Sequence, residues 1–115
     1  MNTRIIVATE FFASHAWTTA PDHRAYLRCQ HFHAFRVRFE AVVSHEEREL
    51  EFHDVRERLD AVIRGLLRDN SETPRWSCET WARNIMEAMG SMCGCDTACE
   101  VWEDHAHGAR VEAFR

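Results

Sequence analysis

Three histidines in this sequence have a spacing that could bind a metal ion. His31 and His33 form an H-x-H pair, and in an extended chain residues two apart point the same way, with roughly 6 to 7 Å between their Cα atoms. His15 ends the first predicted strand and comes close to the pair if the first two strands form a hairpin. Three neutral imidazoles with an open fourth position are typical of a catalytic zinc site. The alternative is a pair of ordinary surface histidines, because H-x-H also occurs at His105 and His107.

A carboxylate near the end of the chain is a second candidate for chemistry. Glu103 shares one face of a predicted strand with Cys99 and Val101. A carboxylate in line with apolar neighbours needs a partner, since burying an unpaired charge is costly. A glutamate that simply meets water at the strand end is the alternative.

The elements that position these residues follow from hydrophobic periodicity. Residues 3–14 and 33–43 are predicted strands, and the second alternates apolar and charged side chains with a period of two. Asp54 is the predicted N-cap of a helix that fades near Asp69, and Ser77 is the predicted N-cap of a second helix that stops at Gly90. Residues 98–103 and 109–114 are the last two predicted strands, and residues 16–28 read as a loop. This order predicts an α+β fold with a four-stranded antiparallel sheet and both helices on one face.

Composition limits the possible functions. The chain has 115 residues, of which 45% are hydrophobic, so we expect one domain spanning residues 1–115. The net charge of −5 argues against a nucleic-acid partner. All 14 basic residues are arginine, which excludes Schiff-base chemistry and a P-loop lysine.

The chain shows no signal of a membrane or secreted location. No stretch approaches the length of a transmembrane helix, and the N-terminus lacks a signal-peptide pattern. The five cysteines are an odd number, which favours reduced thiols in a cytoplasmic protein.

Five segments, in order along the chain, resemble motifs of the 6-pyruvoyl-tetrahydropterin synthase and 6-carboxy-tetrahydropterin synthase family. Phe11-Phe12-Ala13-Ser14-His15 resembles the F-x-A-A-H end of that family's first strand, and His31-Phe32-His33 resembles its H-G-H motif. Residues 51–56 are similar to its D-F-G-D-L-K segment, residues 77–80 to its P-T-x-E-N segment, and residues 101–104 to its V-x-Y-E-T strand.

The resemblance implies a fold, a cofactor and a substrate class. The fold would be the tunnelling fold (T-fold), with Zn²⁺ bound by His15, His31 and His33. Glu103 would anchor a pterin ring by accepting hydrogen bonds from its 2-amino and N3–H groups, and Glu79 would be a second substrate-binding residue. Because a sheet with one uncovered face and open edges usually needs another subunit, we expect a homo-oligomer, a trimer or a hexamer.

The sequence also departs from the family. Leu27 stands where the family has its catalytic cysteine, and residues 68–75, between the helices, contain no histidine to form the family's Asp-His pair. Cys29 is one candidate substitute, because in an extended chain it faces the same side as the H-x-H pair, and a thiol beside a metal ion has a lowered pKa. His23 and His105 are further candidates for acid–base chemistry. Small buried residues or solvated loop histidines are the alternatives.

The expected activity is therefore that of a zinc-dependent, tetrahydropterin synthase-like lyase. Its substrate would be a pterin like dihydroneopterin triphosphate, or a related purine-like compound. The reaction would be carbon–oxygen bond elimination or the formation of a 6-carboxy product. The alternative is a non-catalytic zinc- and heterocycle-binding module, a sensor or an inhibitor, which the missing acid–base residues favour.

Overall fold

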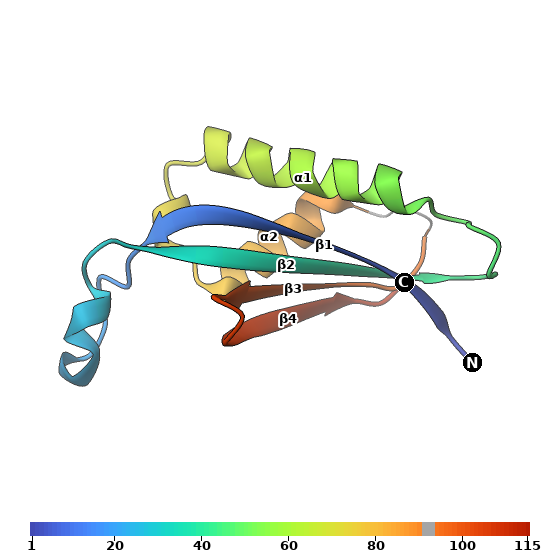
Figure 1. Ribbon diagram of the computed structural model, residues 1–115. Coiled ribbons are helices and arrows are strands. Elements are labelled where there is room, and N and C mark those ends of the chain that lie inside the picture. The colour runs from blue at the N-terminus through green and yellow to red at the C-terminus, as the bar shows by residue number, and fades with distance from the viewer. Residues whose placement is uncertain (91–93) are drawn as a thin grey trace.

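The structure, a computed structural model, describes residues 1–90 and 94–115, and these form one antiparallel sheet and two long helices (Figure 1). In chain order the elements are β1 (Thr3–His15), β2 (His31–Val43), α1 (Phe52–Asp69), α2 (Cys78–Met89), β3 (Thr97–Glu103) and β4 (His107–Ala113). The sheet order is β1-β2-β3-β4, and every neighbouring pair is antiparallel. The predicted α+β class with ββααββ order is confirmed, and it is consistent with T-fold topology.

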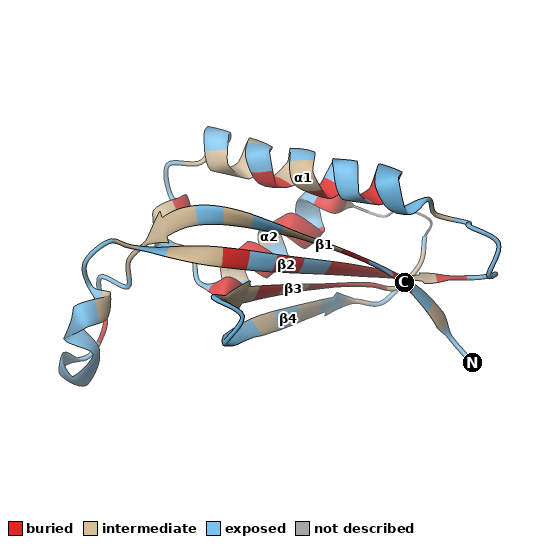
Figure 2. Cartoon of the chain, viewed as in Figure 1, coloured by how far each residue is buried: buried red, intermediate tan, exposed pale blue. Residues whose placement is uncertain are grey.

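The core lies between the sheet and the two helices. The apolar residues that alternate along β2, from Phe35 to Val43, are buried on the face that the helices cover (Figure 2). They pack against Leu59 of α1 and against Trp81 and Ile85 of α2. Both helices therefore cover the same face of the sheet, as the period-two pattern and the helical stripes predicted.

The helix ends follow local capping chemistry, with one correction. The Ser77 hydroxyl accepts a hydrogen bond from the backbone N–H of Thr80 at 3.2 Å, as an N-cap does. Gly90 ends α2 with a φ of 66°, which favours glycine. The prediction that Asp54 caps α1 is wrong. The N-cap is Glu51, three residues earlier, and its side chain accepts the hydrogen bond from the Asp54 N–H.

The histidines lie at the end of the β1–β2 hairpin where β1 ends and β2 begins. The pairing runs from Thr3 opposite Val43 to His15 opposite His31, so β2 begins two residues before the predicted start at His33. The hydrophobic alternation misses these two positions because the residues there are polar or exposed. The predicted loop that joins the strands contains a short 3₁₀ helix, Asp22–Leu27, which projects beyond the sheet in Figure 1.

The structure bears on two expectations, the absence of a transmembrane helix and the reduced state of the cysteines. No helix in the described residues combines the length and the apolar character needed to span a membrane. Cys29, Cys78 and Cys99 are free thiols, whereas Cys95 is disulfide-bonded, so the prediction of reduced thiols is wrong at Cys95. Cys93 lies outside the described residues.

Candidate metal centre

His15, His31 and His33 form a compact cluster at the end of the β1–β2 hairpin. Each histidine offers a ring nitrogen that lies within 4.8 Å of the nitrogens offered by the other two. The ring centroids are 4.5 Å apart for His15 and His31, 4.9 Å for His15 and His33, and 4.8 Å for His31 and His33. The cluster could hold a metal ion, as the H-x-H spacing and the predicted hairpin together suggested.

The sheet register explains how residues distant in sequence come together. His15 is the direct cross-strand partner of His31, and His33 lies two residues further along β2 on the same face. Phe35, the next residue on that face, is fully buried, and its ring centroid lies 5.6 Å from that of His15 and 5.9 Å from that of His33. The imidazoles thus rest on the edge of the hydrophobic core, which limits their rotation.

Each histidine is held at its Nδ1 atom by a group that can only accept a hydrogen bond. Nδ1 of His15 is 3.4 Å from the backbone oxygen of Trp76, and Nδ1 of His31 is 2.8 Å from that of Cys29. Nδ1 of His33 contacts the carboxylate of Asp104. Because carbonyl and carboxylate oxygens accept but do not donate, each Nδ1 carries the proton in these contacts. In a neutral imidazole the Nε2 lone pair is then free to bind a metal ion.

The Nε2 atoms need such a partner. Within the described residues, Nε2 of His31 and of His33 is buried without a hydrogen-bond partner, and buried polar atoms are rarely left this way. Burial also lowers the pKa of His15, and the two neighbouring histidines add to this effect. A lowered pKa favours the neutral form, the form that coordinates metals. The three residues therefore fit a metal ion in geometry, and the lowered pKa of His15 supports this.

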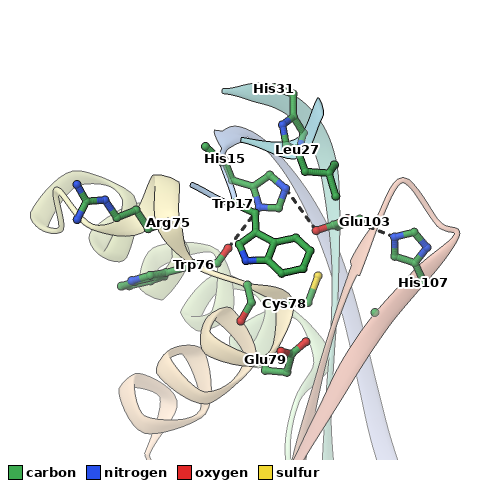
Figure 3. Close-up of a pocket in the computed structure, with 13 residues that line it drawn as sticks. His15, Trp17, Leu27, His31, Arg75, Trp76, Cys78, Glu79, Glu103 and His107 are labelled. Carbon is green, nitrogen blue, oxygen red and sulfur yellow. Dashed lines mark hydrogen bonds and ion pairs between the residues drawn. The ribbon is translucent and has the colours of Figure 1, made fainter. Parts of the chain in front are cut away.

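A pocket of about 510 Å³ opens beside the cluster (Figure 3). His15 and His31 line it, together with the N-terminal turn of α2, the end of β3 and the start of β4. Trp17 and Trp76 also line it, and this volume is typical of small-molecule sites. Arg75 lines it too, 3.4 Å from the carboxylate of Glu72.

The structure places Glu103 directly beside the histidines. Its Oε1 is 3.5 Å from Nε2 of His15, and its Oε2 is 3.9 Å from Nε2 of His33. Oε2 also lies 3.3 Å from Nε2 of His107, an exposed residue at the start of β4. The Glu103 side chain is only 18% exposed, so the alternative of a strand-end glutamate in open water is wrong. Glu79 lines the pocket separately, from the first turn of α2 (Figure 3).

The thiol that lines the pocket is Cys78, which sequence reasoning did not single out. Leu27 also lines the pocket, so an apolar side chain is present where the resemblance would place a cysteine. Burial, with the nearby carboxylates of Glu103 and Glu79, raises the pKa of Cys78 to about 12. The thiol therefore stays protonated at neutral pH and is a poor nucleophile or base.

The three predicted substitutes for the missing acid–base groups lie outside the pocket lining. Cys29 is exposed in a bend before β2 rather than in an extended segment, and its backbone oxygen accepts the hydrogen bond from His31. His23 lies in the projecting 3₁₀ helix. His105 pairs with Glu10 of β1 at 2.7 Å. Of the histidines that follow Glu103, it is His107 that reaches the pocket.

No family model matches the sequence, and no curated protein matches it. The likeness to the tetrahydropterin synthase family therefore remains a prediction that rests on the five short motifs.

Proposed function

We propose that this protein is a zinc-dependent lyase of the tetrahydropterin synthase type. Its substrate would be a pterin like dihydroneopterin triphosphate, or a related purine-like compound. The observation that carries the proposal is the three-histidine cluster, in which Nε2 of His31 and of His33 is buried without a hydrogen-bond partner among the described residues, beside a pocket lined by two carboxylates and two tryptophans. Imidazole ligands suit zinc, and three of them leave the open position of a catalytic site.

The pocket residues divide into binding and proton-handling groups. A bound zinc ion would act as a Lewis acid on oxygens of the substrate side chain. The Glu79 carboxylate can accept two hydrogen bonds from the 2-amino and N3–H edge of a pterin, and the Trp17 indole can stack on the ring. The resemblance implies that Glu103 anchors the pterin, but its oxygens lie 3.5 and 3.9 Å from Nε2 of His15 and His33, so we assign the anchor to Glu79 instead. Glu103, paired with His107, is the carboxylate that we expect to hold or move a proton beside the metal.

Glutamine variants test this division of roles. Glu103→Gln should lower the turnover rate by about 10²- to 10⁴-fold, the usual range for a general acid or base. Glu79→Gln should instead weaken substrate binding by about 10- to 150-fold, because hydrogen bonds to a charged group contribute about 1.5–3 kcal/mol. The measurement is triphosphate release from dihydroneopterin triphosphate by the zinc-loaded protein, over a range of substrate concentrations.

Glu87→Gln is the matched control, because Glu87 is an exposed carboxylate on the same helix as Glu79. Wild-type rates in all three variants would contradict the proposed roles. Binding of the pterin without any turnover by the wild type would favour the second candidate, a zinc- and heterocycle-binding sensor or inhibitor. One feature favours that candidate: burial and the nearby carboxylates raise the pKa of Cys78, the cysteine among the described lining residues of the pocket, to about 12.

We also propose that the protein forms a trimer or a hexamer. Phe12 of β1 and Phe32 of β2 lie on the sheet face away from the helices and are 75% and 80% exposed. Exposed apolar side chains of this size on an uncovered face are typical of a subunit interface. Within the described residues, β1 and β4 are the edge strands of the sheet, and edge strands can pair with another chain.

Light scattering on the purified protein should give a mass of about three or six times the chain mass of 13.5 kDa. Changing Phe12 and Phe32 together to serine should release smaller species. Phe52→Ser, at an exposed phenylalanine that begins α1, should keep the wild-type mass. A wild-type mass of one chain would contradict the proposal.

A further inference from the structure

Asp104 differs from the other two groups that hold the histidines at Nδ1. His15 and His31 donate to backbone carbonyl oxygens, whereas His33 donates to the Asp104 side chain. A carboxylate is the stronger acceptor because it carries a charge. The orientation of His33 is therefore the one that a single side-chain substitution can change.

The backbone of Ala34 holds Asp104 through two hydrogen bonds, one to its carboxylate and one from its backbone N–H. Its Oδ1 accepts a hydrogen bond from the Ala34 N–H at 3.0 Å, and its own N–H donates to the Ala34 carbonyl at 2.9 Å. Ala34 follows His33 directly on β2 and lies next to Phe35, whose cross-strand partner is Glu103. Asp104 thus ties the turn after β3 to β2 and leaves Oδ2 for His33.

The turn that presents Asp104 has a backbone that glycine or asparagine would suit better. Asp104 has a φ of 51° and His105 a φ of 63°, both in the left-handed region. The Ala106 N–H donates to the Glu103 carbonyl at 2.9 Å and closes the turn. Strained backbone of this kind tends to occur where a side chain serves a site.

We propose that Asp104 is a positioning residue of the metal centre, which fixes the Nδ1–H form of His33 and directs its Nε2 toward His15 and His31. This inference rests on the proposed metal site. A carboxylate that binds the outer nitrogen of a histidine ligand sets both its tautomer and its ring orientation. The competing explanation is that Asp104 serves only the turn, through its backbone and its bonds to Ala34.

Two substitutions at Asp104 separate these explanations. Asp104→Gly suits the positive φ but removes the acceptor, so a residue that served only the turn could be replaced without loss of metal affinity. Asp104→Asn keeps the shape and tolerates the backbone. Its amide must either turn the NH₂ group toward His33, which favours the Nε2–H tautomer, or lose the bond to Ala34. His105→Gly is the matched control, because it relaxes the neighbouring position and touches none of the three ligands.

The experiment combines long-range ¹H–¹⁵N NMR of the metal-free protein with zinc affinity from chelator competition. We expect the Nδ1–H form of His33 in the wild type and in His105→Gly, and a substantial Nε2–H population in both Asp104 variants. Zinc should bind about 10- to 100-fold more weakly to the Asp104 variants, the usual cost of removing a group that orients a ligand. Thermal unfolding of the metal-free proteins shows whether each variant folds.

Each other outcome has a definite meaning. If folded Asp104→Gly and Asp104→Asn bind zinc as tightly as His105→Gly, Asp104 is a turn residue and the inference is wrong, while the metal site stands. If the wild type binds no zinc, the proposed function fails, and this inference fails with it. A His33 tautomer that is unchanged in folded Asp104→Gly would also overturn it, whatever the zinc affinity.

Discussion

Replacing His31 and His33 together by alanine should abolish zinc binding. We expect about one zinc per chain in the wild type, since the three histidines form a single site. Structural zinc sites with four protein ligands bind with about 10–16 kcal/mol, or about 3 kcal/mol per ligand, so losing two ligands should weaken binding by about 10⁴-fold. Metal analysis of the dialysed proteins measures the stoichiometry, and chelator competition measures the change in affinity.

The chain supplies its own control for spacing. His105→Asn with His107→Asn removes the second H-x-H pair, which lies outside the three-histidine cluster. This variant should keep its zinc. Zinc should also still stabilise it, by about 2.7 kcal/mol at a zinc concentration 100 times Kd. The His31/His33 variant should show no zinc-dependent rise in Tm. Equal zinc content in the two double variants would show that the cluster is not the site.

Phe35→Ala should both destabilise the protein and weaken metal binding. The side chain is fully buried, with its ring 5.2 Å from that of Phe11 and against the rings of His15 and His33. Truncating a buried phenylalanine costs about 3–5 kcal/mol, a large part of the 5–15 kcal/mol by which domains are usually stable. The cavity should also free the two imidazoles to rotate, so we expect zinc affinity to fall by about tenfold or more.

Phe39→Ala separates these two effects. Phe39 is equally buried on the same face of β2, but it lies opposite Val7 and Cys99, away from the histidines. Denaturant unfolding of the metal-free proteins should give similar losses for the two variants, whereas chelator competition should show weaker zinc binding for Phe35→Ala alone. Phe35→Leu, a milder change, serves if the alanine variants do not fold. If the folded Phe35 and Phe39 variants bind zinc with the same affinity, Phe35 does not help to hold the metal ligands.

Much of the architecture could be predicted because its signals are local. The alternation along β2 depends only on the period of an extended chain, and it correctly identified the face that the helices cover. Ser77 and Gly90 mark helix ends through their own side-chain and backbone chemistry. Asp54 was misassigned because Glu51 offers the same kind of acceptor three residues earlier, and the local pattern does not distinguish them.

The site was predictable only in part. The H-x-H spacing placed His31 and His33 on one side of a strand, and the hairpin hypothesis brought in His15. The proton-handling candidates were less predictable, because whether a side chain reaches a pocket depends on turn geometry. His105 and His107 look equivalent in sequence, yet the left-handed turn directs one toward Glu10 and the other toward Glu103.

The sequence by itself determined the order of the elements, the buried face of the sheet and the common side of the H-x-H pair, since each follows from periodicity over a few residues. The tertiary structure alone decided which groups hold and surround the histidines. The Nδ1 partner of His15 is 61 residues away, at Trp76, and that of His33 is 71 residues away, at Asp104. Hydrogen bonds are short and directional, so such partners are fixed only when strand register, helix packing and turn conformation are fixed together.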